Sequence, residues 1–313
     1  MAAKMYVFSV ITRRLLLLAV LFLATAFAHI LLARNFAQPP LPASPKRIVS
    51  LAPSVTETLY AIGLGAEVAA VTRFCEYPPE VKTKPKVAGF FGSVDYEALL
   101  RVRPDMVVLP VDQAESLTRL RQLGLPTLSM DTRSLGGLLT AIEVLGKGTH
   151  RAREADELLG TIRLSMDAAK KRAEGRAKPK VLFSVMHAYE GLGRITEINA
   201  VGSDGFYSEL IAMAGGENVY RGPLAFPRLS REAIMYLDPD VIIDVVPPYV
   251  DMPTVLRDWL ALSSVSAVRK GRVFVFSDEA DTVPGPRFYQ TLTKLSLAFH
   301  PSAAESDGRT GSE

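Results

Sequence analysis

Short apolar runs alternate with helical patterns from Lys46 to Leu145, and the same alternation returns from Val181 to Phe299. In the first stretch the pattern predicts strands and helices in turn: strands 48–51, 68–71, 106–109 and 127–130, and helices 54–63, 96–102, 116–123 and 135–145. In the second stretch it predicts strands 181–185, 241–245 and 273–276, and helices 205–213, 231–236, 254–262 and 287–299. Strands that alternate with helices are typical of a mainly parallel sheet covered on both faces. The pattern therefore predicts two αβ units.

A long charged segment, Thr149–Arg176, separates these two units. Acidic side chains cluster early in it, basic side chains cluster late, and a broken apolar stripe runs between them. This order favours the helix macrodipole, with Thr149 as the expected N-cap and Gly175 as the stop. A surface helix of a single domain would show the same features, so the flanking units decide its role.

The flanking units repeat each other. Residues 91–109 align without a gap with residues 226–244 at a constant offset of 135, since Phe91 matches Phe226 and Glu97 matches Glu232. The pair Pro104-Asp105 likewise matches Pro239-Asp240. A looser match sets residues 57–63 beside residues 209–215. The repeat indicates a duplicated lobe on each side of the long helix, and that helix becomes the predicted connection.

The repeated side chains have two interpretations each. Phe91 and Phe226 lie in irregular loops, where they either face a cleft between lobes or pack within their own lobe. Glu97 and Glu232 lie in the first turn of a short helix, next to the possible N-caps Asp95 and Ser230. There they stabilise the helix dipole by about 0.3–1 kcal/mol. Two equivalent carboxylates also form a symmetric pair of docking points for arginines on a two-fold partner.

The N-terminus predicts export. Lys4, Arg13 and Arg14 precede the apolar run Leu15–Ala28, which ends in a small-x-small cleavage site. If the run continues to Ala33, it reaches the ~18–20 residues that a spanning helix needs. We expect a signal peptide or membrane anchor over residues 1–33 and a Pro-rich linker over 34–45. An N-terminal lobe (46–148), a connecting helix (149–176), a C-terminal lobe (177–301) and a disordered tail (302–313) follow.

Composition narrows the function classes. The chain has 313 residues, of which 48% are hydrophobic, and its net charge of +3 is too balanced to predict a nucleic-acid partner. Cys75 is the only cysteine, which excludes an intramolecular disulfide. The four histidines form no paired metal motif, and no serine or cysteine has a base and orienting group that the sequence places beside it. We expect neither an enzyme nor a resident cofactor or metal.

Several segments resemble the periplasmic binding proteins of the cobalamin and iron-siderophore uptake class. The segments are KRIVSLAPSVTETLYAIGLG, the Tyr77-Pro78-Pro79 turn, YEALLRVRPDMVVL, FYSELIAMAGGENVY, SREAIMYLDPDVII and PGPRFYQTLTKLSLAFHP. The resemblance covers about Lys46–Pro301 and implies two Rossmann-like αβ lobes joined by one long backbone helix, the class III architecture. It also implies a ligand between the lobes and docking on an ABC permease dimer through Glu97 and Glu232.

The resemblance implies ligand contacts but leaves the ligand open. The expected ligand-binding residues are Tyr77, Phe90, Phe91, Tyr189, Phe226 and Arg287. A corrinoid such as cobalamin suits aromatic cleft residues, although phenylalanines stand where cobalamin binders have tryptophans. A ferric siderophore would instead use arginines, for which the candidates are Arg73, Arg194, Arg221 and Arg228. Haem would need an axial ligand, for which the candidates are Tyr77, Tyr189 and His187.

We therefore predict a monomeric receptor outside the cytoplasm that captures a metal chelate and delivers it to an ABC importer. The alternative is a membrane-anchored sensory or interaction domain that keeps the receptor fold without transport.

Overall fold

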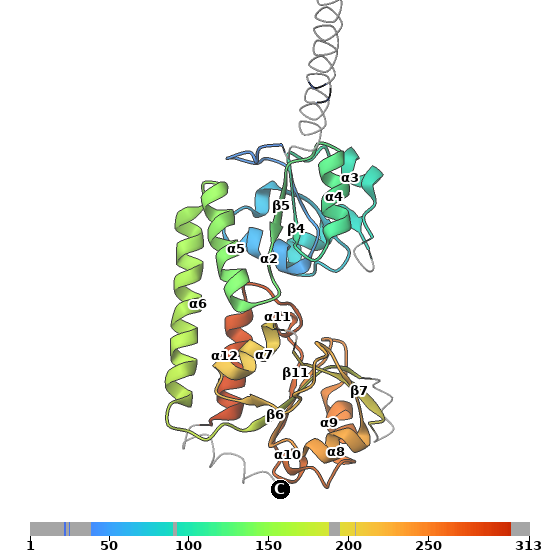
Figure 1. The fold of residues 1–313 in the computed structure, drawn as a ribbon, viewed down its shortest axis with the longest axis vertical. Helices are drawn as coiled ribbons and strands as arrows, with labels where there is room; N and C mark the ends of the chain where they lie inside the picture. The colour runs from blue at the N-terminus through green and yellow to red at the C-terminus, as the bar shows by residue number, and fades with distance from the viewer. Residues whose placement is uncertain are drawn as a thin grey trace, which may run out of the picture.

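The computed structural model describes residues 39–89, 93–187, 195–203 and 205–301, together with Phe22 and Thr25. Two αβ lobes lie one above the other in Figure 1, and helix α6 (Ala152–Ala173) runs along one side of both. The fold prediction of two αβ lobes on one long helix is confirmed. Most of the predicted leader, and the predicted tail 302–313, lie outside the described residues.

The N-terminal lobe contains a five-stranded sheet in the order β3-β2-β1-β4-β5. All of its strand pairs are parallel, as predicted. The strands are β1 (Ile48–Ser50), β2 (Val68–Thr72), β3 (Lys86–Ala88), β4 (Met106–Pro110) and β5 (Thr127–Met130). The helices are α2 (Pro53–Ala61), α3 (Tyr96–Arg101), α4 (Ala114–Gln122) and α5 (Leu135–Gly148), with short 3-10 turns at Gly65–Glu67 and Pro79–Thr83. This strand order is that of a doubly wound αβ fold.

The C-terminal lobe contains a six-stranded sheet in which β11-β10-β6-β7-β9 are neighbours and β8 pairs with β6. Its strands are β6 (Lys180–His187), β7 (Glu197–Ala200), β8 (Glu217–Asn218), β9 (Arg228–Ser230), β10 (Val241–Val245) and β11 (Val273–Phe276). Its helices are α7 (Phe206–Met213), α8 (Arg231–Leu237), α9 (Met252–Leu260), α10 (Ser266–Arg269), α11 (Glu279–Thr282) and α12 (Phe288–Phe299). Strands β7 and β9 pair antiparallel, so this sheet is mixed.

One apolar core passes through both lobes. It joins the inner face of each sheet to the helices beside α6, and its fully buried members include Ile48 of β1, Ile162 of α6 and Phe183 of β6. Separate cores cover the outer faces, under α3 and α4 in the upper lobe and under α8 and α9 in the lower lobe. Burial on both faces explains why the strands read as continuous apolar runs. The shared core couples the two lobes.

The start of the long helix differs from the prediction. Thr149 is not its N-cap: the Thr149 hydroxyl donates to the Leu145 carbonyl at 2.7 Å, and the residue closes α5. A threonine hydroxyl can bond to the carbonyl four residues earlier, and here α5 continues to Gly148 and provides that carbonyl. Helix α6 begins after Arg151, and the chain leaves it through Gly175 with φ at +70°.

The segment Ser54–Glu57 has the sequence pattern of a capping box, from which a helix start at Ser54 is expected, but the structure does not form one. Helix α2 begins at Pro53, and its N-cap residue Ala52 makes no side-chain cap. Proline is favoured at the first helical position because its φ is already helical and no amide is lost there. Glu57 therefore lies in the middle of α2, where it is buried, and not in the first turn.

The repeat at offset 135 appears in the structure element by element. Helix α3 begins at residue 96 and α8 at residue 231, while β4 begins at residue 106 and β10 at residue 241. The N-caps match as well, because Asp95 accepts from the Ala98 amide and Ser230 from the Ala233 amide. Asp105 accepts from the backbone just before β1, and Asp240 accepts from the first residue of β6. The repeated residues therefore build the same local structure twice.

Within the described part of the chain, no helix has the length and apolarity needed to cross a membrane. The segment for which we predict a signal or anchor is described only at Phe22 and Thr25, both helical. The domain boundaries stated above stay predictions.

Candidate functional site

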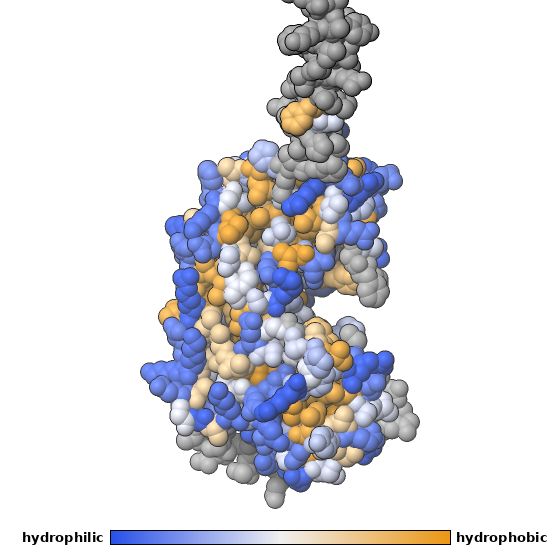
Figure 2. All heavy atoms as spheres, viewed as in Figure 1, coloured by the Kyte–Doolittle hydropathy of each residue, from blue (hydrophilic) through white to orange (hydrophobic). Residues whose placement is uncertain are grey.

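A cavity of about 640 Å³ opens between the two lobes. Figure 2 shows the surface hollowed at this level, with the lobes above and below. Its lining residues follow the carboxyl ends of parallel strands: Pro53 follows β1, Tyr77 lies beyond β2, Tyr249 follows β10 and Glu279 follows β11. Open αβ sheets place their ligand sites at this edge. The carboxyl ends of the strands in both sheets therefore face the same cavity.

Aromatic and acidic side chains dominate the cavity. The aromatic members are Phe74, Tyr77 and Tyr249, and the acidic members are Glu57, Glu76 and Glu279. Tyr249 is 88% exposed and Phe74 is partly exposed, so apolar surface faces solvent at the rim. Flat aromatic faces beside a few polar groups are typical of a site for a large organic ligand.

Arg287 is not among the lining residues of the cavity but contacts two of them, Glu57 and Tyr77. Its Nε donates to Glu57 Oε2 at 2.9 Å, and its Nη2 donates to Glu57 Oε1 at 2.7 Å. Its guanidinium carbon also lies 3.6 Å from the centroid of the Tyr77 ring. Arg287, which we predicted as a ligand contact, thus has a carboxylate on its edge and an aromatic ring on its face. In this arrangement it supports the wall of the cavity through Tyr77.

Burial decides the electrostatics of this pair. Burial raises the pKa of the Glu57 carboxyl, and the hydrogen bond and charge of Arg287 offset only part of that rise. Burial also acts to lower the pKa of the Arg287 guanidinium, but the hydrogen bond and charge of Glu57 outweigh it and the pKa is raised. The guanidinium behind the cavity wall therefore stays charged and is already bound by the Glu57 carboxyl group.

A second carboxylate joins the lobes at the matching place in the other half. Glu209 Oε2 accepts from the Leu135 amide at 2.8 Å, at the first residue of α5. Glu57 and Glu209 are the pair that the looser sequence match aligns, and each lies on the first helix of its sheet. The looser match thus marks two contacts at the junction of the lobes, a role that the sequence alone does not reveal.

Of the other predicted ligand residues, one lines the cavity, one does not, and three lie outside the described residues. Tyr77 lines the cavity, whereas Phe226 is 50% exposed and is not among the lining residues. Phe90, Phe91 and Tyr189 lie outside the described residues. Sequence reasoning missed Phe74, Tyr249 and Glu279. The available signal for Tyr249 was its position after Pro247-Pro248 at the end of a buried strand.

The residues considered for other ligands are mostly engaged elsewhere. Arg221 pairs with Glu217 and Arg228 pairs with Glu197, while Arg194 lies outside the described residues. Arg73 lines a separate pocket of about 450 Å³ beside β3. Cys75 is buried, and its sulfur lies 3.1 Å from the Thr56 hydroxyl and 3.2 Å from the Thr72 hydroxyl. Among the described residues, no group of three or more potential ligand side chains is placed to hold a metal ion.

The predicted docking residues are both exposed. The Glu97 side chain is 83% exposed and lies 3.6 Å from Arg101 on the next turn of α3. Glu232 Oε2 accepts from the Ser230 hydroxyl at 2.8 Å. The Glu232 backbone amide and the Ser230 hydroxyl hold the pKa of the Glu232 carboxyl below its usual value. Both groups are therefore available to an external partner as exposed carboxyl groups at equivalent places in the two lobes.

This architecture is that of a class III solute-binding receptor: two αβ lobes on one helix, with an aromatic cavity between strand ends. The chain belongs to the periplasmic binding protein family, because the family described as "Periplasmic binding protein" matches residues 48–280.

Relatives in this family are substrate-binding proteins. The chain is 26% identical over 262 residues to the uncharacterised ABC transporter substrate-binding lipoprotein YvrC of Bacillus subtilis, with 82% of this chain and 81% of that protein covered. It is 28% identical over 200 residues to a vitamin B12-binding protein of Vibrio campbellii, with 63% of this chain and 70% of that protein covered. These relatives confirm the predicted class, a substrate-binding protein of an ABC importer, and do not favour the sensory alternative.

Solved structures show the same fold. The periplasmic heme-binding protein RhuT of Roseiflexus sp. RS-1 is 26% identical and superposes with a TM-score of 0.67, over 82% of this chain and 98% of that one. The vitamin B12-binding protein BtuF of Vibrio cholerae superposes with a TM-score of 0.68 at 23% identity, over 82% of this chain and 96% of that one.

Proposed function

We propose that this chain captures a metal chelate between its lobes, a corrinoid first, and delivers it to an ABC permease dimer. The observation that carries the proposal is the interlobe cavity of about 640 Å³, which combines aromatic faces with acidic side chains at converging strand ends. Relatives named as binders of vitamin B12 and haem support a chelate as the cargo.

The charge of the cavity supports a corrinoid over an anionic chelate. Three glutamates line it, of which Glu57 is paired with Arg287 and Glu76 with Lys82, and no arginine or lysine is among its described lining residues. An anionic ferric siderophore or a haem with two propionates would meet no cationic lining group there. A corrinoid presents a large ring with apolar faces and no such excess of negative charge. We rank ferric siderophores and haem after corrinoids as the expected ligand.

Delivery would use the two exposed glutamates. Glu97 and Glu232 occupy the same turn of equivalent helices, which suits arginines repeated by the two-fold axis of a permease dimer. The receptor acts as a monomer, since its two lobes already provide one docking point for each permease subunit. It has no catalytic step in this scheme, and it works in the periplasm or at the outer side of the membrane, where its N-terminal segment would direct it.

The lobes move little on capture. Helix α6 joins them, a common apolar core runs between them, and Glu57 and Glu209 add hydrogen bonds at the junction. A packed core has discrete arrangements and resists continuous bending. The cargo therefore enters a largely formed site.

Titration of the purified protein with cyanocobalamin, haemin and a ferric tris-catecholate tests the proposal. Cyanocobalamin should bind tightest in calorimetry, and native mass spectrometry of the exported protein should show a corrinoid mass and the mature N-terminus. Binding of none of the three chelates would refute chelate capture. Tightest binding of haemin or the catecholate would refute the corrinoid assignment alone.

A further inference from the structure

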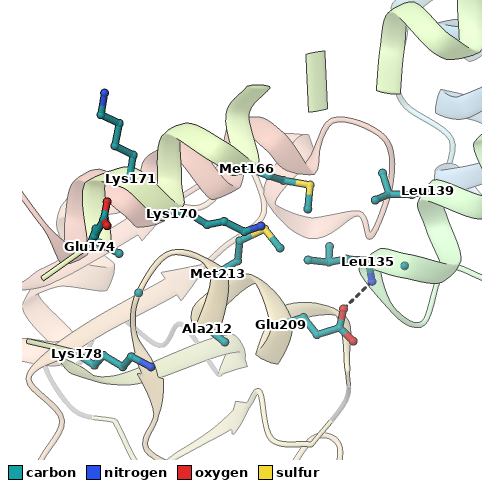
Figure 3. Close-up of a pocket in the computed structure, with 13 residues that line it drawn as sticks. Leu135, Leu139, Met166, Lys170, Lys171, Glu174, Lys178, Glu209, Ala212 and Met213 are labelled. Carbon is teal, nitrogen blue, oxygen red and sulfur yellow. Dashed lines mark hydrogen bonds between the residues drawn. The ribbon is translucent and has the colours of Figure 1, made fainter. Parts of the chain in front are cut away.

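A second hollow, larger than the interlobe cavity, lies where α5, α6 and α7 meet. Its volume is about 1060 Å³, and it shares no lining residue with the interlobe cavity. Figure 3 shows its walls, with α6 above, α7 below and the first turn of α5 at one end. We call it the three-helix groove.

The walls of the groove are apolar. Leu139, Met166 and Met213 line it and are only partly buried, so apolar surface from all three helices faces the hollow. Figure 3 shows the thioether groups of both methionines inside the groove. Methionine side chains are flexible and polarisable, and they adapt to chains of varied shape. Apolar surface gathered in one concave place is the kind of feature that marks a binding site.

Two ammonium groups accompany this apolar surface. Lys170 extends from α6 along the groove, while Lys178 belongs to the segment that follows α6 and lies toward the end of the groove away from Leu135 (Figure 3). Ion pairs among the described residues engage other lysines: Lys82, Lys147, Lys270 and Lys294. In the described part of the chain, neither Lys170 nor Lys178 has such a pair.

The remaining charges leave the groove positive. Three lysines and two glutamates line it, which is a net charge of +1. Of the two carboxylates, Glu209 already accepts from the Leu135 amide, and Glu174 lies at the end of the groove away from Leu135 (Figure 3). Lysines near the end of a helix also favour the helix dipole, which accounts for their charge. That role does not account for the direction of Lys170, over an apolar wall.

We propose that the three-helix groove binds a single-chain anionic amphiphile, a long-chain carboxylate, with its alkyl chain between Met166 and Met213 and its carboxylate on Lys170, while Lys178 adds positive charge farther along the groove. The apolar walls select the chain, and the unpaired ammonium groups select a negative headgroup over a neutral one. The occupant would touch both α5 and α7, the helices that the Glu209 hydrogen bond joins. This site is separate from the chelate site and adds a second ligand to the protein.

Calorimetric titration with dodecanoate, below its micelle concentration, tests the proposal with a matched pair of variants. Lys170→Glu should weaken binding about tenfold, because it replaces the attraction for the headgroup by repulsion. Lys147→Glu makes the same charge change at an exposed lysine of α5 that does not line the groove. It should stay within about twofold of the unmodified protein.

Two further binding measurements test where the alkyl chain lies and whether the headgroup charge matters. Ala212 is exposed and lines the groove, so Ala212→Trp should fill the hollow without disturbing the core and abolish dodecanoate binding. Dodecyl maltoside, which has the same chain and a neutral head, should bind at least about tenfold more weakly than dodecanoate. Thermal melts followed by circular dichroism show that each variant is folded. No binding of dodecanoate, equal losses in the two lysine variants, or full binding by Ala212→Trp would overturn the proposal.

Discussion

Arg287 binds Glu57 with two hydrogen bonds, at 2.9 and 2.7 Å, although 230 residues separate the two in sequence. The Glu57 side chain is 3% exposed and that of Arg287 is 15% exposed, so the pair is largely shielded from water. One residue belongs to the N-terminal lobe, and the other directly precedes the last helix. The pair therefore ties the end of the chain to the first lobe beneath the cavity.

Arg287→Ala should lower the free energy of unfolding by about 3 kcal/mol, because it leaves the Glu57 carboxylate buried without a partner. Urea denaturation measures this loss. Glu57→Gln is the control: it removes the buried charge and keeps an acceptor, so its loss should be about 1 kcal/mol. The double variant should be more stable than Arg287→Ala alone. A double variant whose loss equals the sum of the two single losses would show that the pair is not coupled.

The Arg287→Ala variant should also respond to pH. Burial already raises the pKa of Glu57, and the variant removes the contacts with Arg287 that lower it. The folded variant then holds a proton at pH values where the unfolded carboxyl is ionised, so its stability increases as pH falls through the raised pKa. Its deficit against the unmodified protein should shrink as pH falls toward 4.5, the usual pKa of a glutamate carboxyl. A deficit that is constant, or that grows on acidification, contradicts this account.

Tyr77→Ala should weaken corrinoid binding about tenfold, because it removes an aromatic wall of the cavity. Tyr77→Phe keeps the ring and its stacking on Arg287, and its binding should stay within about twofold. Calorimetry on the three proteins measures both effects. If both substitutions weaken corrinoid binding equally, the Tyr77 hydroxyl rather than its ring makes the contact, and the aromatic role assigned here is wrong.

Short strands bounded by turns are the elements that the sequence predicts best. The runs 127–130, 241–245 and 273–276 match β5, β10 and β11 residue for residue, because their turn-rich flanks leave few alternatives for where each strand begins and ends. Strands β7 and β9 were missed, since each is short and forms by pairing with a distant segment. Local preference cannot indicate such pairing.

The candidate site was predicted less completely than the fold. The repeat located Glu97 and Glu232, because both lie on equivalent helices whose sequence pattern is local. The pairing of Glu57 with Arg287 depends on how the two lobes stack, which no local pattern encodes. Thr149 shows a related difficulty, since its hydroxyl can cap a following helix or bond back to a preceding one, and only the length of α5 decides.

Uptake should fail in a Glu97→Ala, Glu232→Ala double variant that still binds its ligand, because neither lobe would present a carboxylate to the permease. The measurement is ligand uptake by cells that contain the cognate permease and lack other receptors. Glu157→Ala is a suitable control, since Glu157 is an exposed glutamate on α6 that pairs with Arg153. Unchanged uptake by the double variant would exclude docking through these two residues.

Stability should fall in mild acid because of His300. This histidine is 4% exposed, and its Nε2 donates to the Gly215 carbonyl at 3.3 Å. Burial lowers the pKa of His300 from its usual 6.5, and the charges of Arg176, Arg272 and Arg172 add to the lowering. The unfolded chain then takes up a proton before the folded protein does, so the stability contributed by His300 is complete above pH 6.5 and is lost as pH falls below that value.

Denaturation of a His300→Gln variant as a function of pH measures this contribution. The variant keeps an amide donor for Gly215 but has no proton to take up, so the slope of stability below pH 6.5 should flatten. His150→Gln, at an exposed histidine, is the matched control and should retain the slope of the unmodified protein. If both variants flatten the curve equally, or neither does, the slope arises from groups other than the buried His300 ring.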